Sequence, residues 1–206
     1  MKRTLALLLL AAILMISFTS CGPYSDAEAN EILNEILIRE AELNQYIYGN
    51  AFKTKEDPGD DVNSPYQQYY EVAPDSKYLT VTSLKAEVDA LIVSTSRDGI
   101  YGYAFDGTSD EIASYPPRFR ENETTKNLDI NVADKSNYQL RTVALLNSAE
   151  VTRSNKTHIK AEITVYRYSA DGSVTQGKKD VEIRMEDGVW KLVNQTLIGG
   201  TTDTEK

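Results

Sequence analysis

The spacing of apolar residues changes once along the chain, and this change limits the fold more than any other feature of the sequence. Over residues 26–48, and again over 82–94, apolar residues recur every three or four positions, as on one face of a helix. From about residue 117 they alternate with polar residues, as in strands with one buried face. Helices followed by strands predict an α+β domain with N-terminal helices packed on an antiparallel sheet.

Local signals set the limits of both expected helices. Ser25 and Glu28 have the spacing of a capping box at the start of the first helix, and Gly49 is suited to its end. Thr82 or Ser83 can cap the second helix. Each helix has a single apolar face, so we expect both to cover one face of the sheet.

Five alternating runs predict about four to five strands, with hairpin turns at Asp171-Gly172 and Asp187-Gly188. The runs lie near residues 128–132, 143–151, 159–165, 181–185 and 190–198. Because the second turn is short, the strands beside it should be antiparallel neighbours. Residues 199–206 are polar and are expected to form a mobile tail.

The first residues of the chain have the pattern of an export signal. A basic start at residues 1–3 precedes an almost wholly apolar run over 5–18, which is shorter than a membrane-spanning helix. Cys21, the only cysteine, follows Phe18-Thr19-Ser20. This segment resembles the lipobox of bacterial lipoproteins, although the family prefers Leu where this chain has Phe18. The resemblance implies a signal peptide over 1–20 and a lipid, such as palmitate, on Cys21.

These features predict an extracytoplasmic protein that is held at the cell membrane by the lipid on Cys21. Residues 21–24 would form the lipidated N-terminus and a short tether, and residues 25–198 a single domain. Removing the signal changes the net charge from −9 to −11, because Lys2 and Arg3 are lost. Such an acidic chain is not expected to bind nucleic acid, which needs clustered basic residues.

Two segments in the C-terminal half resemble a known fold. Residues 181–194 read V-E-I-R-M-E-D-G-V-W-K-L-V-N, and residues 160–172 read K-A-E-I-T-V-Y-R-Y-S-A-D-G. A strand, an acidic-Gly turn and a W-K-L strand resemble the end of nuclear transport factor two-like domains. The resemblance implies a cone-shaped sheet curved around N-terminal helices. Cystatin-like folds share this order of elements, and neither fold determines a function.

Glu40 is the one acidic residue that lies within the apolar face of the first helix, between Ile36 and Leu43. If the cone encloses a cavity, burial would raise the pKa of this carboxyl, and it could bind a ligand or act as a base. The alternatives are an ion pair with an arginine or a position at the edge of the apolar face.

Thirteen tyrosines are many for 206 residues, and several lie in the irregular segments 50–78 and 100–121. Tyrosine combines an apolar ring with a polar hydroxyl, which suits a partner surface or a sugar. We therefore selected Tyr101, Tyr103 and Tyr115 as candidate ligand-binding residues. The alternative is that these rings pack beneath loops. Tyr66, Tyr69 and Tyr70 would share a face if their segment were helical.

Other polar groups are weaker candidates. His158 is expected on the polar face of a strand, in contact with solvent, and a catalytic triad is therefore poorly supported. Asp57, Asp60, Asp61 and Asn63 are close in sequence but do not have the spacing of a calcium loop. The sequence contains no phosphate-binding loop, dinucleotide fingerprint or zinc motif, and we assign no cofactor, metal or catalytic residue.

These observations favour a non-catalytic envelope lipoprotein that binds a protein partner or a small ligand through a cavity or a tyrosine-rich surface. The alternative is a cavity-type enzyme that uses a pocket carboxylate such as Glu40. A tethered structural spacer is a third possibility.

Overall fold

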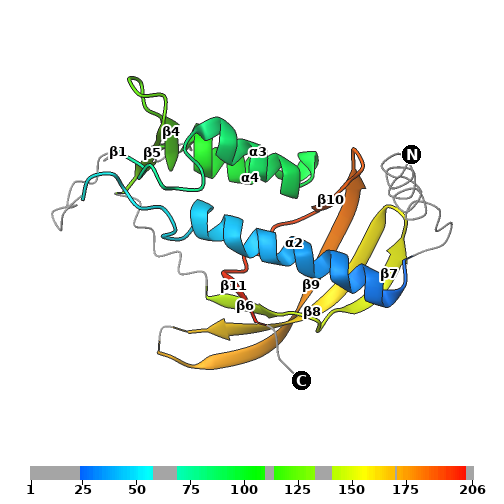
Figure 1. Ribbon diagram of the computed structural model, residues 1–206. Coiled ribbons are helices and arrows are strands. Elements are labelled where there is room, and N and C mark those ends of the chain that lie inside the picture. Colours follow the sequence, from blue (N-terminus) through cyan, green and yellow to red (C-terminus); the bar gives the residue numbers. More distant parts are fainter. Residues whose placement is uncertain (1–23, 58–68, 110–113, 133–140, 170, 203–206) are drawn as a thin grey trace, which may run out of the picture.

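The computed structural model describes residues 24–57, 69–109, 114–132, 141–169 and 171–202 (Figure 1). Its helices are α2 (Asp26–Ile47), α3 (Val81–Leu91), α4 (Asp98–Tyr101), the 3-10 turn η1 (Ser94–Ser96) and the π-helical turn η2 (Gly102–Asp106). Its largest sheet contains β6 (Thr142–Leu145), β7 (Glu150–Asn155), β8 (His158–Tyr168), β9 (Val174–Glu186), β10 (Val189–Leu192) and β11 (Gly200–Thr202). A smaller sheet contains β1 (Tyr69–Glu71), β4 (Phe119–Glu121) and β5 (Leu128–Asn131), and β2 (Thr108–Ser109) pairs with β3 (Ser114–Tyr115).

Helix α2 begins at the predicted capping box. The Ser25 hydroxyl accepts a hydrogen bond from the Glu28 amide, and the Glu28 carboxylate accepts one from the Ser25 amide at 2.9 Å. The apolar face of the helix is buried along its length, from Ala29 through Leu33 and Leu37 to Ile47. Helix α2 contacts β7, β10 and β11, so the apolar face meets the sheet as the pattern predicted.

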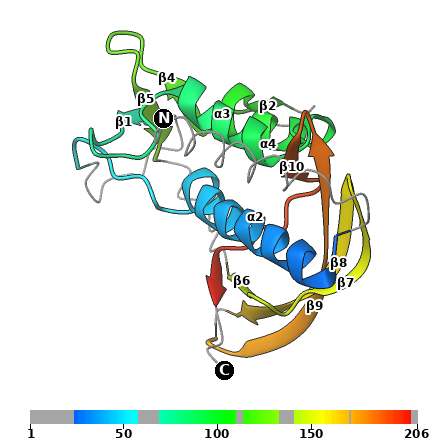
Figure 2. The ribbon, with the colours of Figure 1, turned by 45° about the vertical axis from the view of Figure 1, so that its right-hand side comes forward.

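The largest sheet is curved, and α2 lies in its concave side (Figures 1 and 2). The long strands β8 and β9 are antiparallel over eleven residue pairs, and β10 continues the sheet beside β9. Alternate residues of β8, from Ile159 to Val165, are buried, while the residues between them are largely polar. The α+β class, the curved antiparallel sheet and the N-terminal helices are confirmed. The cone that the resemblance implies fits this arrangement.

Both predicted hairpin turns are confirmed. Gly172 has a φ of 82° between β8 and β9. Asp187 and Gly188 have φ angles of 55° and 79° between β9 and β10. Two successive positive φ angles are typical of the turn that matches strand twist in a two-residue hairpin. Strands β9 and β10 are therefore antiparallel neighbours, as expected.

The run at 143–151 is two strands, β6 and β7, instead of one. Asn147 interrupts the run with a φ of 58°, and its amide and side chain bond to Asn34 of α2. The Ser148 hydroxyl donates to the Leu145 carbonyl and accepts from the Thr164 amide of β8. These side-chain bonds replace strand pairing at this point, so β6 and β7 pair with different parts of β8.

Three further expectations differ from the structure. The run at 128–132 forms β5 in the smaller sheet, where it pairs with β1 and β4. The second helix is capped by Thr80 instead of Thr82 or Ser83, and it ends at Leu91 instead of 94, because Ile92 is extended and bridges to Leu192. Within the expected tail, residues 200–202 form β11, which pairs parallel with β6. This pairing satisfies backbone groups that a tail would leave to water.

Candidate functional site

Cys21 and the expected signal lie outside the described residues, as do Tyr66, Asp60, Asp61 and Asn63. Among the residues that the structure describes, no helix has the length and hydropathy to cross a membrane. The described residues also contain no group of three or more His, Cys, Asp or Glu side chains that could hold a metal ion. Asp57 is the one member of the acidic segment 57–63 considered above that is among the described residues.

Glu40 is fully buried on α2, and it binds a distant part of the chain. Its carboxylate accepts hydrogen bonds from the Thr196 amide and hydroxyl, and from the Leu197 amide at 3.3 Å. Burial raises the pKa of Glu40, while the hydrogen bonds from Thr196 act in the opposite direction. The prediction that burial perturbs this carboxyl is therefore supported, but its partners are two backbone amides and one hydroxyl of the chain itself.

Two further side chains of α2 hold the same segment. The Asn44 amide donates to the Ile198 carbonyl at 3.0 Å, and the Gln45 amide donates to the Gly199 carbonyl. Lys179 of β9 donates to the Thr196 carbonyl. Together these bonds fix residues 196–199 against α2, directly before β11. We call this set of bonds between α2 and residues 196–199 the C-terminal clasp.

The three candidate tyrosines do not form one surface. The Tyr101 hydroxyl donates to Asp89 at 2.6 Å, and its ring meets Phe105 edge to face. Tyr103 stacks on Tyr48 with 5.2 Å between ring centroids. Tyr115 is 61% exposed on β3. Tyr101 and Tyr103 are partly buried and pack against the core, as the alternative interpretation expected.

Tyr101 belongs to a polar network beside β9 and β10. Arg97 pairs with Asp89 at 2.8 Å and with Glu186 at 3.5 Å. The Glu186 carboxylate also accepts from Lys191 at 3.2 Å and from the Ser94 amide, and these contacts lower its pKa. The network joins α3 and the turn after it to the sheet, which is a structural role.

His158 is on the polar side of β8, as predicted, but it is not simply in contact with solvent. Its imidazole lies 2.5 Å from the Glu182 carboxylate on the neighbouring strand, and Lys160 pairs with the same carboxylate at 2.7 Å. These are cross-strand pairs of a sheet surface.

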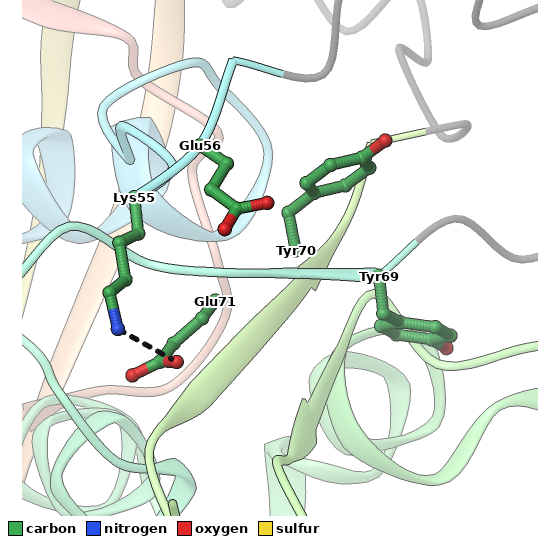
Figure 3. Close-up of a pocket in the computed structure, with 5 residues that line it drawn as sticks. All are labelled: Lys55, Glu56, Tyr69, Tyr70 and Glu71. Atoms are coloured by element: carbon green, nitrogen blue, oxygen red, sulfur yellow. Dashed lines mark ion pairs between the residues drawn. The ribbon is translucent and has the colours of Figure 1, made fainter.

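A pocket of about 270 Å³ lies at the edge of the smaller sheet (Figure 3). It is lined by Lys55, Glu56, Tyr69, Tyr70 and Glu71. The segment before Glu56 pairs with the end of β1 through a bridge from Thr54 to Val72 and a hydrogen bond from the Lys55 amide to the Glu71 carbonyl. The pocket lies where this pairing ends.

Glu71 is the most firmly held of the lining residues. The Asn127 amide donates to its carboxylate at 2.5 Å, and Lys55 lies 3.6 Å from the other oxygen. The hydrogen bond from Asn127 is the main cause that lowers the pKa of Glu71, and Lys55 adds to it. The carboxylate is therefore ionised and fixed in direction at neutral pH.

The two tyrosines point to different sides of β1, as successive strand residues do (Figure 3). The Tyr69 ring lies under the Arg120 guanidinium, at 3.9 Å, and its hydroxyl donates to the Pro117 carbonyl at 2.5 Å. Tyr70 is half-buried and extends on the side of Glu56 (Figure 3). The helical arrangement considered for this segment is wrong, because residues 69–71 form a strand.

The sequence drew attention to Tyr69 and Tyr70 but gave no reason to select Lys55, Glu56 or Glu71. The sequence around these charged residues has no regular apolar pattern, and the pairing of residues 54–55 with the end of β1 brings them together. No protein-family model matches the chain, and no curated protein matches it significantly. The function is accordingly inferred from the chain's own residues.

Proposed function

We propose that this chain is a lipid-anchored protein of the bacterial cell envelope whose domain binds a protein partner or a small ligand and catalyses no reaction. The observation that carries the anchor is Cys21, the only cysteine, placed directly after a basic start and an apolar run. A thiol in an exported chain is reactive unless it is used. Two acyl chains on it would give stable membrane attachment.

The pocket lined by Lys55, Glu56, Tyr69, Tyr70 and Glu71 is the surface that best supports ligand binding. It combines aromatic rings with charged groups, and one of its carboxylates is held in place by neighbours. Polar groups that are already fixed in the free protein lose little conformational entropy when a ligand binds. None of the three tyrosines selected from the sequence lines this pocket.

The position of Glu40 argues against the alternative of a cavity-type enzyme. The side chain is fully buried, and its carboxylate accepts hydrogen bonds from Thr196 and Leu197. A substrate would reach these oxygens only if residues 196–199 left their place. A general base needs direct access to the proton that it removes, so this carboxylate is suited to holding the chain.

Metabolic labelling with an alkyne analogue of palmitate tests the anchor. The unchanged chain should incorporate the label and remain with membranes after a high-salt wash. Cys21→Ala should lose the label, whereas Tyr115→Ala, an exposed substitution within the domain, should keep it. An unlabelled wild-type chain, or a labelled Cys21→Ala variant, would contradict the proposal.

A further inference from the structure

We infer that the pocket beside β1 binds one sugar unit of a neutral saccharide. This inference rests on the proposed function for the presence of a ligand, and it adds the chemical class. The lining residues, Lys55, Glu56, Tyr69, Tyr70 and Glu71, supply three kinds of group: carboxylates, one ammonium and aromatic rings.

The charge of the pocket excludes anions as its preferred ligands. Glu56 and Glu71 contribute two negative charges, and Lys55, the only cation among the lining residues that the structure describes, already pairs with Glu71. The whole chain is also acidic, with a net charge of −9. A phosphate or carboxylate ligand would meet like charges here, and an approach against like charges is unfavourable.

The hydrogen-bonding groups favour a ligand that both donates and accepts. Ionised carboxylates accept only, so Glu56 and Glu71 require donors on the ligand. The Lys55 side chain is 56% exposed and carries three donors, one of which faces Glu71. Its remaining donors suit a ligand oxygen. Sugar hydroxyls donate and accept, whereas an alkylammonium group only donates and offers no acceptor for Lys55.

Tyr70 supplies the apolar part of the site. Tyr69 is engaged on the other side of β1, where Arg120 covers its ring. Tyr70 extends on the side of Glu56, so one aromatic ring lies on the same side of β1 as a carboxylate (Figure 3), and the Lys55–Glu71 pair lines the same pocket from the other side. A sugar ring has an apolar face of C–H groups with hydroxyls around its edge, and this pattern matches a ring bordered by polar groups.

The size of the pocket limits the ligand to a small unit. Pockets that enclose drug-sized molecules have volumes of roughly 300–1,000 Å³. The volume here is about 270 Å³. The site therefore suits a single sugar residue, either free or within a longer chain whose other residues remain outside.

Saturation-transfer NMR on the full lipidated chain, in a detergent without sugar groups, tests the inference. The probes are chitotetraose, cellotetraose and maltotetraose, their two monomers, N-acetylglucosamine and glucose, spermidine and inorganic phosphate. At least one tetrasaccharide should bind saturably, and phosphate should not bind. Equal affinity for the matching monomer would identify a free sugar as the ligand, and tighter binding of the tetramer would identify a glycan chain.

Substitutions test whether the saccharide binds in the pocket beside β1. Tyr70→Ala should raise the dissociation constant of the bound saccharide about three- to tenfold, which corresponds to the loss of one aromatic contact. Tyr70→Phe should retain binding because it keeps the ring, and Glu56→Gln should weaken it without loss of fold. Tyr168→Ala is the matched control, an exposed tyrosine outside the pocket, and should bind as the unchanged chain does.

The absence of binding by all three tetrasaccharides and both monomers would overturn the inference. So would saccharide binding that Tyr70→Ala and Glu56→Gln both leave unchanged. Saturable binding of spermidine alone, weakened by Glu56→Gln, would refute the sugar but leave the pocket as a ligand site. Failure of the palmitate labelling, in contrast, would remove the anchor without affecting this result.

Discussion

Replacing Glu40 by leucine should destabilise the domain strongly, although it places an apolar side chain within the apolar face of α2. A buried carboxylate without partners would be better replaced by leucine. Glu40 has partners: Thr196 donates twice to it and Leu197 once. Leucine can accept none of these bonds, so the donors would lose their acceptor in a buried place.

The magnitude follows from the number of buried donors. A buried polar group that loses its partner costs about 1–3 kcal/mol. Thr196 is 2% exposed, so water cannot readily replace the carboxylate at its amide and hydroxyl. With these two groups and the Leu197 amide left unbonded, Glu40→Leu should lower the free energy of unfolding by at least about 3 kcal/mol.

Glu40→Gln is the matched control, because its carbonyl oxygen still accepts from the Thr196 and Leu197 amides. It should remain within about 1 kcal/mol of the unchanged chain. It should also remove a pH dependence. Burial raises the pKa of Glu40 above its ordinary value of 4.5, so the folded state keeps a proton that the unfolded state has released. The stability from this group is present below the unfolded pKa and is lost as the pH rises through the folded pKa.

Equilibrium unfolding in urea, followed by fluorescence of Trp190, measures both effects. Trp190 is the only tryptophan and packs against Tyr24, with ring centroids 5.7 Å apart. The curves for the unchanged chain and Glu40→Gln should diverge with rising pH above 4.5, the ordinary pKa of the carboxyl. A Glu40→Leu variant as stable as the unchanged chain, or more stable, would refute the reasoning.

Three further perturbations test other parts of the fold. Tyr101→Phe should cost about 1 kcal/mol of stability, because it removes the hydrogen bond to Asp89. In spectrophotometric titration, Tyr78 and Tyr101 of the unchanged chain should both titrate with a pKa of about 12, and the variant should lose the contribution of Tyr101 and keep that of Tyr78. Gly188→Ala should cost about 1–2 kcal/mol in urea unfolding, because φ is 79° there, whereas alanine at Gly177, which lies in open space, should cost less. Ending the chain after Gly199 should lower the melting temperature by removing β11; an unchanged melting temperature would show that this strand contributes nothing.

The sequence predicted the elements whose signals are local. The capping box and the apolar face gave α2 almost to the residue, since 26–48 was expected and Asp26–Ile47 is observed. Alternation and the two Asp-Gly turns gave β8, β9 and β10 in the correct order. These patterns depend on residues close together in the chain, so no knowledge of the rest of the fold is needed.

The elements that were missed depend on distant partners. Residues 200–202 are polar and contain no apolar alternation, and only pairing with β6 makes them a strand. Residues 69–71 form β1 only through pairing with β5. Asn147 divides an apparently continuous strand because it bonds to Asn34, far away in sequence.

The candidate site was predicted less well than the fold. Glu40 was selected correctly as an unusual acidic residue, but its partners lie 156 and 157 residues away, so its role in the C-terminal clasp could not be seen in the local pattern. The pocket was missed because Glu56 and Glu71 are ordinary surface residues in sequence. The pairing of residues 54–55 with the end of β1 brings them together.

The most direct test of the central claim is the mass of the N-terminal peptide from protein isolated from its own membranes. A lipid-anchored envelope protein should yield a peptide that begins at Cys21 and carries a diacylglyceryl group on the sulfur. A peptide that begins elsewhere, or an unmodified Cys21 thiol, would contradict the anchor and the cellular location inferred from it.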